Sequence, residues 1–193
     1  MLPHFLAVPL DLSYGPGAPR ESELRLLGPL AGKRVLVLGC TDPATPVALA
    51  TQDAKVVAVE PSAERAEAAR AQSDAAGVKV ELHEVDFADL AFVRADTIDA
   101  AVAVLALAEV ADLDRVFRQV HRVLRAQGPL VLSLPHPAAT LADGGSWFDR
   151  SIADVFGSLA RTSFGVDVLL EPLPAPGARV PVTLVVRGRK LGT

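Results

Sequence analysis

The feature that most constrains the fold is an alternation between short apolar runs and segments of helical spacing, beginning at Arg34. Residues 34–39 and 55–60 are two such apolar runs, and residues 43–51 between them read as a short helix that starts with a proline. Continuous apolar runs joined by helices are typical of parallel strands covered on both faces. The pattern therefore predicts a βαβ unit within an α/β fold.

The same alternation continues along the chain. Ser62 and Asp112 stand where N-cap residues precede two helices, which close at Gly77 and Gly128. Three further strands are expected at 78–83, 98–105 and 129–134. A helix is expected at 151–161, and a closing pair of strands at 164–171 and 180–187. Prolines and a glycine between the last two strands favour a hairpin loop.

The length and composition of the chain indicate which classes of protein it can belong to. A chain of 193 residues, half of them hydrophobic and 22% charged, is sized for one packed domain. It has neither a basic leader region nor a run of about 18 apolar residues, so we expect a cytoplasmic protein outside the membrane. The lone Cys40 offers no internal disulfide, and no spacing suits a metal site. A net charge of −4 argues against nucleic acid as a partner.

The ends of the predicted strands carry the best candidate binding residues. Gly39 ends the first strand and Glu60 the second, 21 positions later, about the interval at which a carboxylate reaches a ribose diol. The alternative is that Glu60 lies in a solvated loop before a helix. Asp86 follows the third strand, where it could accept from a purine amine or cap a turn.

Five segments, in order and spacing, resemble the class I S-adenosylmethionine (SAM)-dependent methyltransferases: 35–40, 59–62, 86–90, 112–115 with 120–124, and 128–131. Residues 13–19 are similar to the lid arm of one bacterial small-molecule group. The resemblance implies a Rossmann-like three-layer αβα sandwich with a mostly parallel seven-stranded sheet and an antiparallel last strand. It also implies one domain over 1–193, with an arm and lid over 1–30 and the core over 31–193.

The resemblance further implies SAM as cofactor and a small-molecule methyl acceptor. Gly39 would face the methionine part, Glu60 the ribose, Asp86 the adenine amine, and Leu105 would form a pocket wall. The other expected cofactor-binding residues flank these positions: Cys40, Thr41, Pro61 and Phe87.

The glycine-rich loop departs from the family pattern. Only Gly39 remains of three glycines, followed by Thr41, Asp42 and Pro43, and Val37 stands where the family has an acid. A β-branched residue, a negative charge and a missing amide all disfavour close approach of a ligand. A non-catalytic methyltransferase-like partner protein is therefore the alternative function. A nicotinamide dehydrogenase is a third, but its glycine fingerprint is largely missing.

Two residues are candidates for catalysis. His136, between two prolines after the fifth strand, could act as a general base, and Tyr14 could close over the cofactor. A structural histidine and a packing tyrosine are the alternatives. Trp147 and Phe148 follow a glycine-rich stretch that could form a substrate lid or an ordinary loop. We expect Cys40 to be a core residue rather than a nucleophile.

Overall fold

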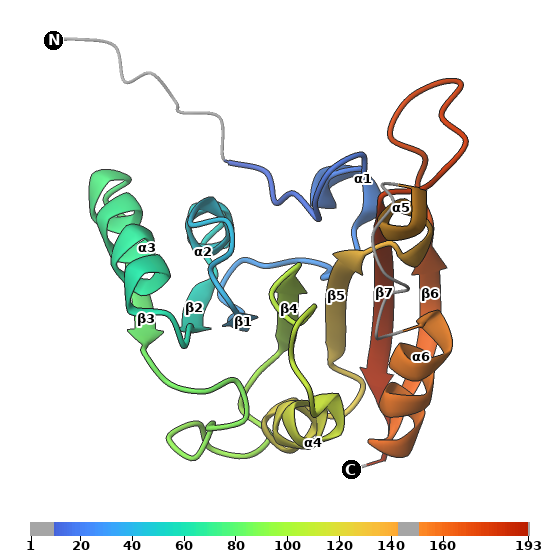
Figure 1. Cartoon of the computed structure of the whole chain (residues 1–193). Coiled ribbons are helices and arrows are strands. Elements are labelled where there is room, and N and C mark those ends of the chain that lie inside the picture. Colours follow the sequence, from blue (N-terminus) through green and yellow to red (C-terminus); the bar gives the residue numbers. More distant parts are fainter. Residues whose placement is uncertain (1–9, 143–150, 193) are drawn as a thin grey trace, which may run out of the picture.

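The structure, a computed structural model, describes residues 10–142 and 151–192. It contains a seven-stranded sheet in the order β3-β2-β1-β4-β5-β7-β6, in which β7 runs antiparallel to both of its neighbours and the other pairs are parallel (Figure 1). The strands are β1 Arg34–Leu38, β2 Lys55–Val59, β3 Val80–His83, β4 Ala100–Val104, β5 Pro129–Pro135, β6 Phe164–Leu170 and β7 Thr183–Lys190. The predicted fold class is confirmed.

Helices cover both faces of this sheet. Figure 1 shows α2 and α3 on one side and α4 and α6 on the other. The helices are α1 Glu21–Leu24, α2 Ala44–Ala50, α3 Ala63–Ala75, α4 Leu113–Val123, α5 Pro137–Ala142 and α6 Ile152–Arg161. The short helices α1 and α5 were not predicted, because four and six residues carry too little periodicity to be recognised.

Local signals set the ends of the longer helices. The Ser62 hydroxyl accepts a hydrogen bond from the Arg65 amide, and the Asp112 carboxylate accepts one from the Arg115 amide. Each side chain satisfies an amide that the first helical turn leaves unpaired, so both predicted N-caps are confirmed. Gly77, just after α3, has a φ of +66°, which a glycine adopts without strain.

Alternate residues of the strands point into two separate apolar cores. On the α4 and α6 side, the core includes Leu36, Val57 and Phe117. On the α2 side, it includes Val35, Val56 and the arm residues Leu12, Tyr14, Leu26, Leu27 and Leu30. Because the central strands are buried on both faces, they show the continuous apolar runs seen in the sequence.

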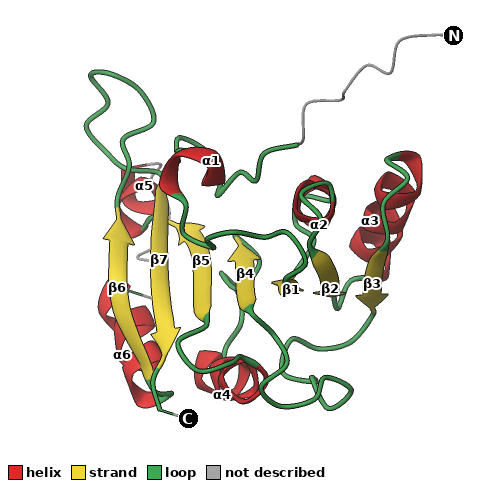
Figure 2. Cartoon of the chain, turned by 180° about the vertical axis from the view of Figure 1, so that it is seen from behind, coloured by secondary structure: helices red, strands yellow, loops and turns green. Residues whose placement is uncertain are grey.

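The described part of the N-terminal arm, residues 10–30, is fixed to the sheet. The Thr183 hydroxyl donates to the Pro16 carbonyl at 2.7 Å, and the Arg187 guanidinium donates to the Leu26 carbonyl at 3.2 Å. Figure 2 shows the chain beyond α1 crossing the strands toward β1. The arm thus covers one side of the carboxyl edge of the sheet.

One connection differs from the sequence-based expectation. The strand expected at 180–187 begins at Thr183 and ends at Lys190, so the loop after β6 is longer than predicted. Residues 84–99 connect β3 to β4 without a helix. Trp147 and Phe148 lie outside the described residues.

Candidate functional site

Gly39 ends β1 and touches the loop that follows β4. Its φ is +88°, and its amide donates to the Val59 carbonyl at 2.8 Å. A Cβ built on Gly39 would lie 2.1 Å from the Cβ of Ala106 and 3.5 Å from the Phe87 ring. Only glycine fits here, since any side chain would collide with Ala106 and strain the backbone. The Gly39–Ala106 contact occupies the place where the resemblance puts the methionine part of the cofactor.

Glu60 follows β2 and has no exposed surface. Its Oε2 accepts from the Cys40 amide at 2.7 Å, while Oε1 accepts from the Ser62 amide at 2.8 Å and from Arg65 Nε at 3.1 Å. Three donors compensate the burial of this carboxylate, which would otherwise be costly. Glu60 therefore links the loop after β1 to the first turn of α3, and it is not the solvated loop residue of the alternative interpretation.

The backbone amides of the loop after Gly39 form hydrogen bonds with side chains of the chain. Asp42 Oδ1 accepts from the Ala44 amide at 2.9 Å and so forms an Asx turn just before α2, while Pro43 has no amide to donate. The Cys40 amide is held by Glu60. Thr41 and Asp42 are exposed. The residues that replace the family's glycines thus form a turn in which the Cys40 and Ala44 amides already bond to side chains of the chain.

A pocket of about 410 Å³, here called the rim pocket, lies at the carboxyl ends of β2, β3 and β4. Its lining combines side chains from several loops: Pro61, Arg65, Asp86, Phe87, Ala106 and Arg115 among others. Asp86 is exposed, and its Oδ1 accepts from the Ala88 amide at 2.8 Å, so it caps a turn and also lines the pocket. Phe87 is 7% exposed and supplies an apolar wall.

The β4 end connects the rim to the arm. Leu105 has a φ of +56°, and its amide donates to the Ser133 carbonyl at 3.0 Å. A Cβ built on Gly15 would lie 3.3 Å from the Leu105 side chain, so the arm packs directly on this loop. A positive φ in a leucine is uncommon and costs conformational energy. The loop after β4 is therefore held between the arm and Gly39.

His136 follows β5 and is 5% exposed. Its Nδ1 accepts from the Ala138 amide at 3.1 Å, which leaves the proton on Nε2, and Nε2 lies 2.8 Å from Glu171 Oε1. Both ring nitrogens are engaged within the chain. His136 does not line the rim pocket.

Tyr14 and Cys40 are both buried completely. The Tyr14 hydroxyl donates to Glu21 Oε2 at 2.6 Å, and burial with the nearby Glu21 carboxylate raises its pKa far above the usual value. Burial, followed by the Glu60 charge, raises the pKa of the Cys40 thiol to about 12. Tyr14 thus anchors the arm through Glu21, and Cys40 sits in the core as expected.

Sequence reasoning missed two residues of this region, Arg65 and Ala106. Arg65 lies in the first turn of α3, five positions after Glu60, a spacing that could have suggested the ion pair. Ala106 carries no chemical signal, and its contact with Gly39 depends on tertiary structure. No group of three metal-ligating side chains occurs within residues 10–142 and 151–192, and no helix there is long and apolar enough to span a membrane.

Solved structures of methyltransferases resemble this chain in fold. A methyltransferase from Mesorhizobium loti described as S-adenosylmethionine dependent is 22% identical, covers 88% of this chain and 96% of its own, and has a TM-score of 0.72. A SAM-dependent methyltransferase from Aquifex aeolicus is 17% identical, with 89% of each chain covered and a TM-score of 0.74. These likenesses support the fold.

A geranyl diphosphate methyltransferase in complex with SAM is 18% identical, covers 89% of this chain and 84% of its own, and has a TM-score of 0.71. A comparison with curated proteins found no match. The family model described as "Methyltransferase domain" matches residues 36–132, which span half of the chain, from β1 to β5. The chain therefore belongs to the methyltransferase domain family.

Proposed function

We propose that this chain is a SAM-dependent methyltransferase that acts on a small-molecule acceptor. The observation that carries the proposal is the rim pocket, where the loops after β2, β3 and β4 converge at the carboxyl edge of the sheet. Ligands of open α/β sheets bind at this edge. Family membership and the SAM complex of the geranyl diphosphate enzyme support the choice of cofactor.

The adenine part of SAM fits the residues present. Phe87 offers an apolar wall, and the exposed Asp86 retains Oδ2 as an acceptor for an exocyclic amine. The ribose and the methionine part require a rearrangement, because the Glu60 carboxylate has no exposed surface and Ala106 touches Gly39. We infer that the loop after β4 retracts and that Arg65, half-exposed, releases Glu60 Oε1 for a ribose hydroxyl.

When bound, SAM supplies a methyl group on a sulfonium, which an acceptor lone pair displaces in line. The contribution of this chain would be alignment and exclusion of water, with the arm packed against Leu105 as the cover. His136 remains a predicted base. Before it could take a proton, its Nδ1 would have to leave the Ala138 amide, because Nε2 carries the ring proton and faces Glu171.

A small acceptor is the proposed partner class. A net charge of −4 does not favour a nucleic-acid backbone. The structural neighbour named for geranyl diphosphate acts on a small molecule by its own description.

The second candidate is a non-catalytic methyltransferase-like protein. The Gly39–Ala106 contact favours it, together with a loop whose amides are partly used by Glu60 and Asp42. Cofactor binding separates the two candidates.

A calorimetric titration with S-adenosylhomocysteine (SAH) tests the proposal without knowledge of the acceptor. The methyltransferase proposal expects saturable binding of one SAH per chain. Absence of heat and of thermal stabilisation at millimolar SAH would reject it in favour of the non-catalytic candidate.

A further inference from the structure

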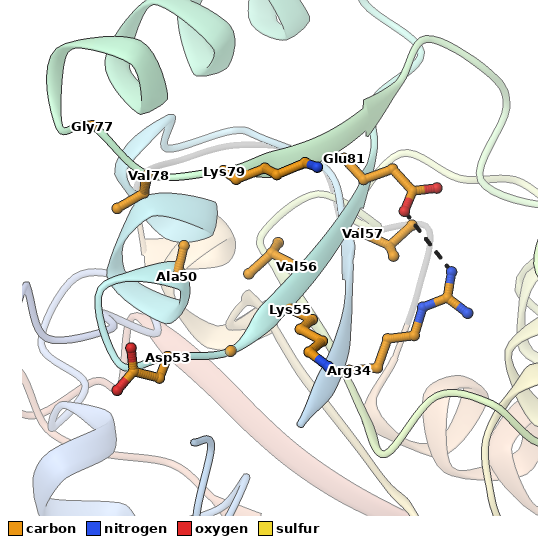
Figure 3. A pocket seen from close by; sticks show the side chains of 11 residues that line it. Arg34, Ala50, Asp53, Lys55, Val56, Val57, Gly77, Val78, Lys79 and Glu81 are labelled. Atoms are coloured by element: carbon orange, nitrogen blue, oxygen red, sulfur yellow. Dashed lines mark ion pairs between the residues drawn. The ribbon is translucent and has the colours of Figure 1, made fainter. Parts of the chain in front are cut away.

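A pocket of about 680 Å³ lies around the amino ends of β1, β2 and β3, at the edge of the sheet opposite the rim pocket (Figure 3). Val56 and Val57, which line it, are 3% and 2% exposed and belong to the cores on opposite faces of β2. They therefore form no shared apolar wall for a ligand. The feature that touches the candidate cofactor site lies at the other edge, in the N-terminal arm.

A closed loop of the arm, residues 13–18, lies at this carboxyl edge, and we call it the arm tip. At its base the Glu21 amide donates to the Leu12 carbonyl at 3.0 Å, and the Tyr14 hydroxyl donates to the Glu21 carboxylate. Leu12 and Tyr14 are completely buried. The base of the loop is therefore anchored in the core independently of the contacts that the tip makes.

The arm tip packs on the loop after β4. Gly15 has a φ of +121°, and a Cβ built on it would lie 3.3 Å from the Leu105 side chain. Leu105 itself has a φ of +56° and packs against the core cluster that contains the arm. Ala106, the next residue, is the one that touches Gly39. The tip thus lies directly against the segment that closes the β1 end of the site.

Two neighbouring segments hold the arm tip in this position. The completely buried Thr183 hydroxyl, at the start of β7, donates to the Pro16 carbonyl at 2.7 Å. A Cβ built on Gly17 would lie 2.6 Å from the Cα of Pro174, in the loop after β6, so only glycine allows this approach of two backbones. Pro16 and Gly17 are exposed. Release of the tip therefore costs this hydrogen bond and this backbone contact, while its own backbone gains water.

We propose that the arm tip is an autoinhibitory strap. Bound to Thr183 and Pro174, it keeps Ala106 against Gly39, and its release lets the loop after β4 withdraw and admit the methionine part of the cofactor. This inference rests on the proposed function, because it assigns the control of the rearrangement that SAM requires. The adenine end lies outside this control, since no arm residue lines the rim pocket.

The substitution that tests the strap is Thr183→Val, which keeps the branched shape and removes the hydrogen bond to the tip. Thr162→Val is the matched control, because Thr162 is also buried but its hydroxyl donates to the Ser158 carbonyl, away from the arm. The readout is hydrogen exchange of the Leu105 amide, which is bonded to β5 in the closed structure. This amide should exchange at least about fivefold faster in Thr183→Val than in Thr162→Val.

A second pair of variants breaks the backbone contact instead. Gly17→Ala drives the tip away from Pro174, at a position with a φ of +71°. Gly177→Ala is its control, because it has a similar φ, +85°, and nothing within 4 Å of the new methyl group. Exchange of the Leu105 amide should accelerate in Gly17→Ala and stay at the wild-type rate in Gly177→Ala. Equal rates within both pairs would overturn the strap.

Calorimetry connects release of the tip to ligand binding. Thr183→Val should bind SAH at least about threefold more tightly than Thr162→Val, with adenosine affinity unchanged. Faster Leu105 exchange with equal SAH affinity in the two variants would overturn the strap and leave the proposed function intact. Faster exchange with no SAH binding by any variant would reject the proposed function, and the exchange would still support control of the loop after β4 by the tip.

Discussion

The two ends of the candidate cofactor site have the same architectural origin and opposite character. Both are loops that follow parallel strands at the carboxyl edge. At the β3 end, the rim pocket is accessible, with Asp86 exposed and Phe87 as a wall. At the β1 end, Gly39 touches Ala106, and the Glu60 carboxylate is enclosed by three donors from the chain itself.

The difference shows how a binding loop becomes a structural turn. In a ligand-binding loop, backbone amides and the acidic residue after β2 are left for the ligand. Here Glu60 takes the Cys40 amide, Asp42 takes the Ala44 amide, and Pro43 has none. These internal bonds stabilise the fold, so under the proposed function a ligand at this end would compete with them.

The largest expected effect comes from Gly39→Ala. The added methyl group meets Ala106 in a backbone with a φ of +88°, so we expect a loss of about 3 kcal/mol of unfolding free energy from strain and overpacking. Urea denaturation measures it. The control Gly28→Ala also has a positive φ, +75°, but has nothing within 4 Å of its new methyl group. Equal losses in the two variants would mean that the contact with Ala106 is not tight.

Glu60→Ala should cost nearly as much. Removing the carboxylate leaves the Cys40 and Ser62 amides without their acceptor, and we expect about 2 kcal/mol of lost stability. Thermal and urea denaturation check the value. The exposed first-turn residue Glu64 provides the control, and Glu64→Ala should change stability by less than about 0.5 kcal/mol. If Glu60→Ala matched this control, Glu60 would not be the link between the two loops.

A substitution that removes the contact at Gly39 should have a smaller effect, and this effect should appear in the affinity for SAH. Ala106→Gly removes the Cβ that touches Gly39, so we expect SAH to bind about fivefold more tightly, or about 1 kcal/mol, with adenosine binding unchanged. Calorimetry with both ligands measures this. Ala108→Gly loosens the same loop, lies outside the lining of the rim pocket and serves as the control for flexibility. A parallel gain for adenosine would show that the substitution acts on the whole pocket.

The smallest effect is expected at the open end. Asp86→Ala should weaken adenosine and SAH by the same factor, about fivefold, since the acceptor it removes faces the nucleoside part only. The melting temperature should fall by only a few degrees, as the residue is exposed and caps one turn. The neighbouring exposed Asp89→Ala is the control. A large drop in stability without a change in binding would assign Asp86 to the turn alone.

The fold could be predicted because each element carried its own local signal. Apolar runs gave the strands from β1 to β5, and Ser62 and Asp112 marked two helix starts that the structure confirms. The start of β7 at Thr183 was missed, because residues 180–182 resemble strand residues and only pairing with β5 excludes them.

The site was less predictable. Spacing placed Gly39, Glu60 and Asp86 at strand ends, but the partners of Glu60 depend on how the loop after β1 meets α3. The Gly39–Ala106 contact joins residues far apart in sequence and has no motif. The ring nitrogens of His136 likewise find Glu171 and Ala138 only in the folded chain. Residue type and spacing predicted which side chains lie at the strand ends. Tertiary contacts decide which of those side chains are left free to bind a ligand.

The central claim is that, in the proposed SAM site, the adenine end is open while the methionine end is closed by the chain. The most direct test is the ratio of the dissociation constants of adenosine and SAH, measured by calorimetry on the same wild-type protein. Because the methionine part must displace Ala106 and its contacts, the account predicts that SAH binds at most about tenfold more tightly than adenosine, a gain below about 1.4 kcal/mol. An SAH affinity more than about a hundredfold above that of adenosine would contradict the account, since the methionine end would then be a formed binding site.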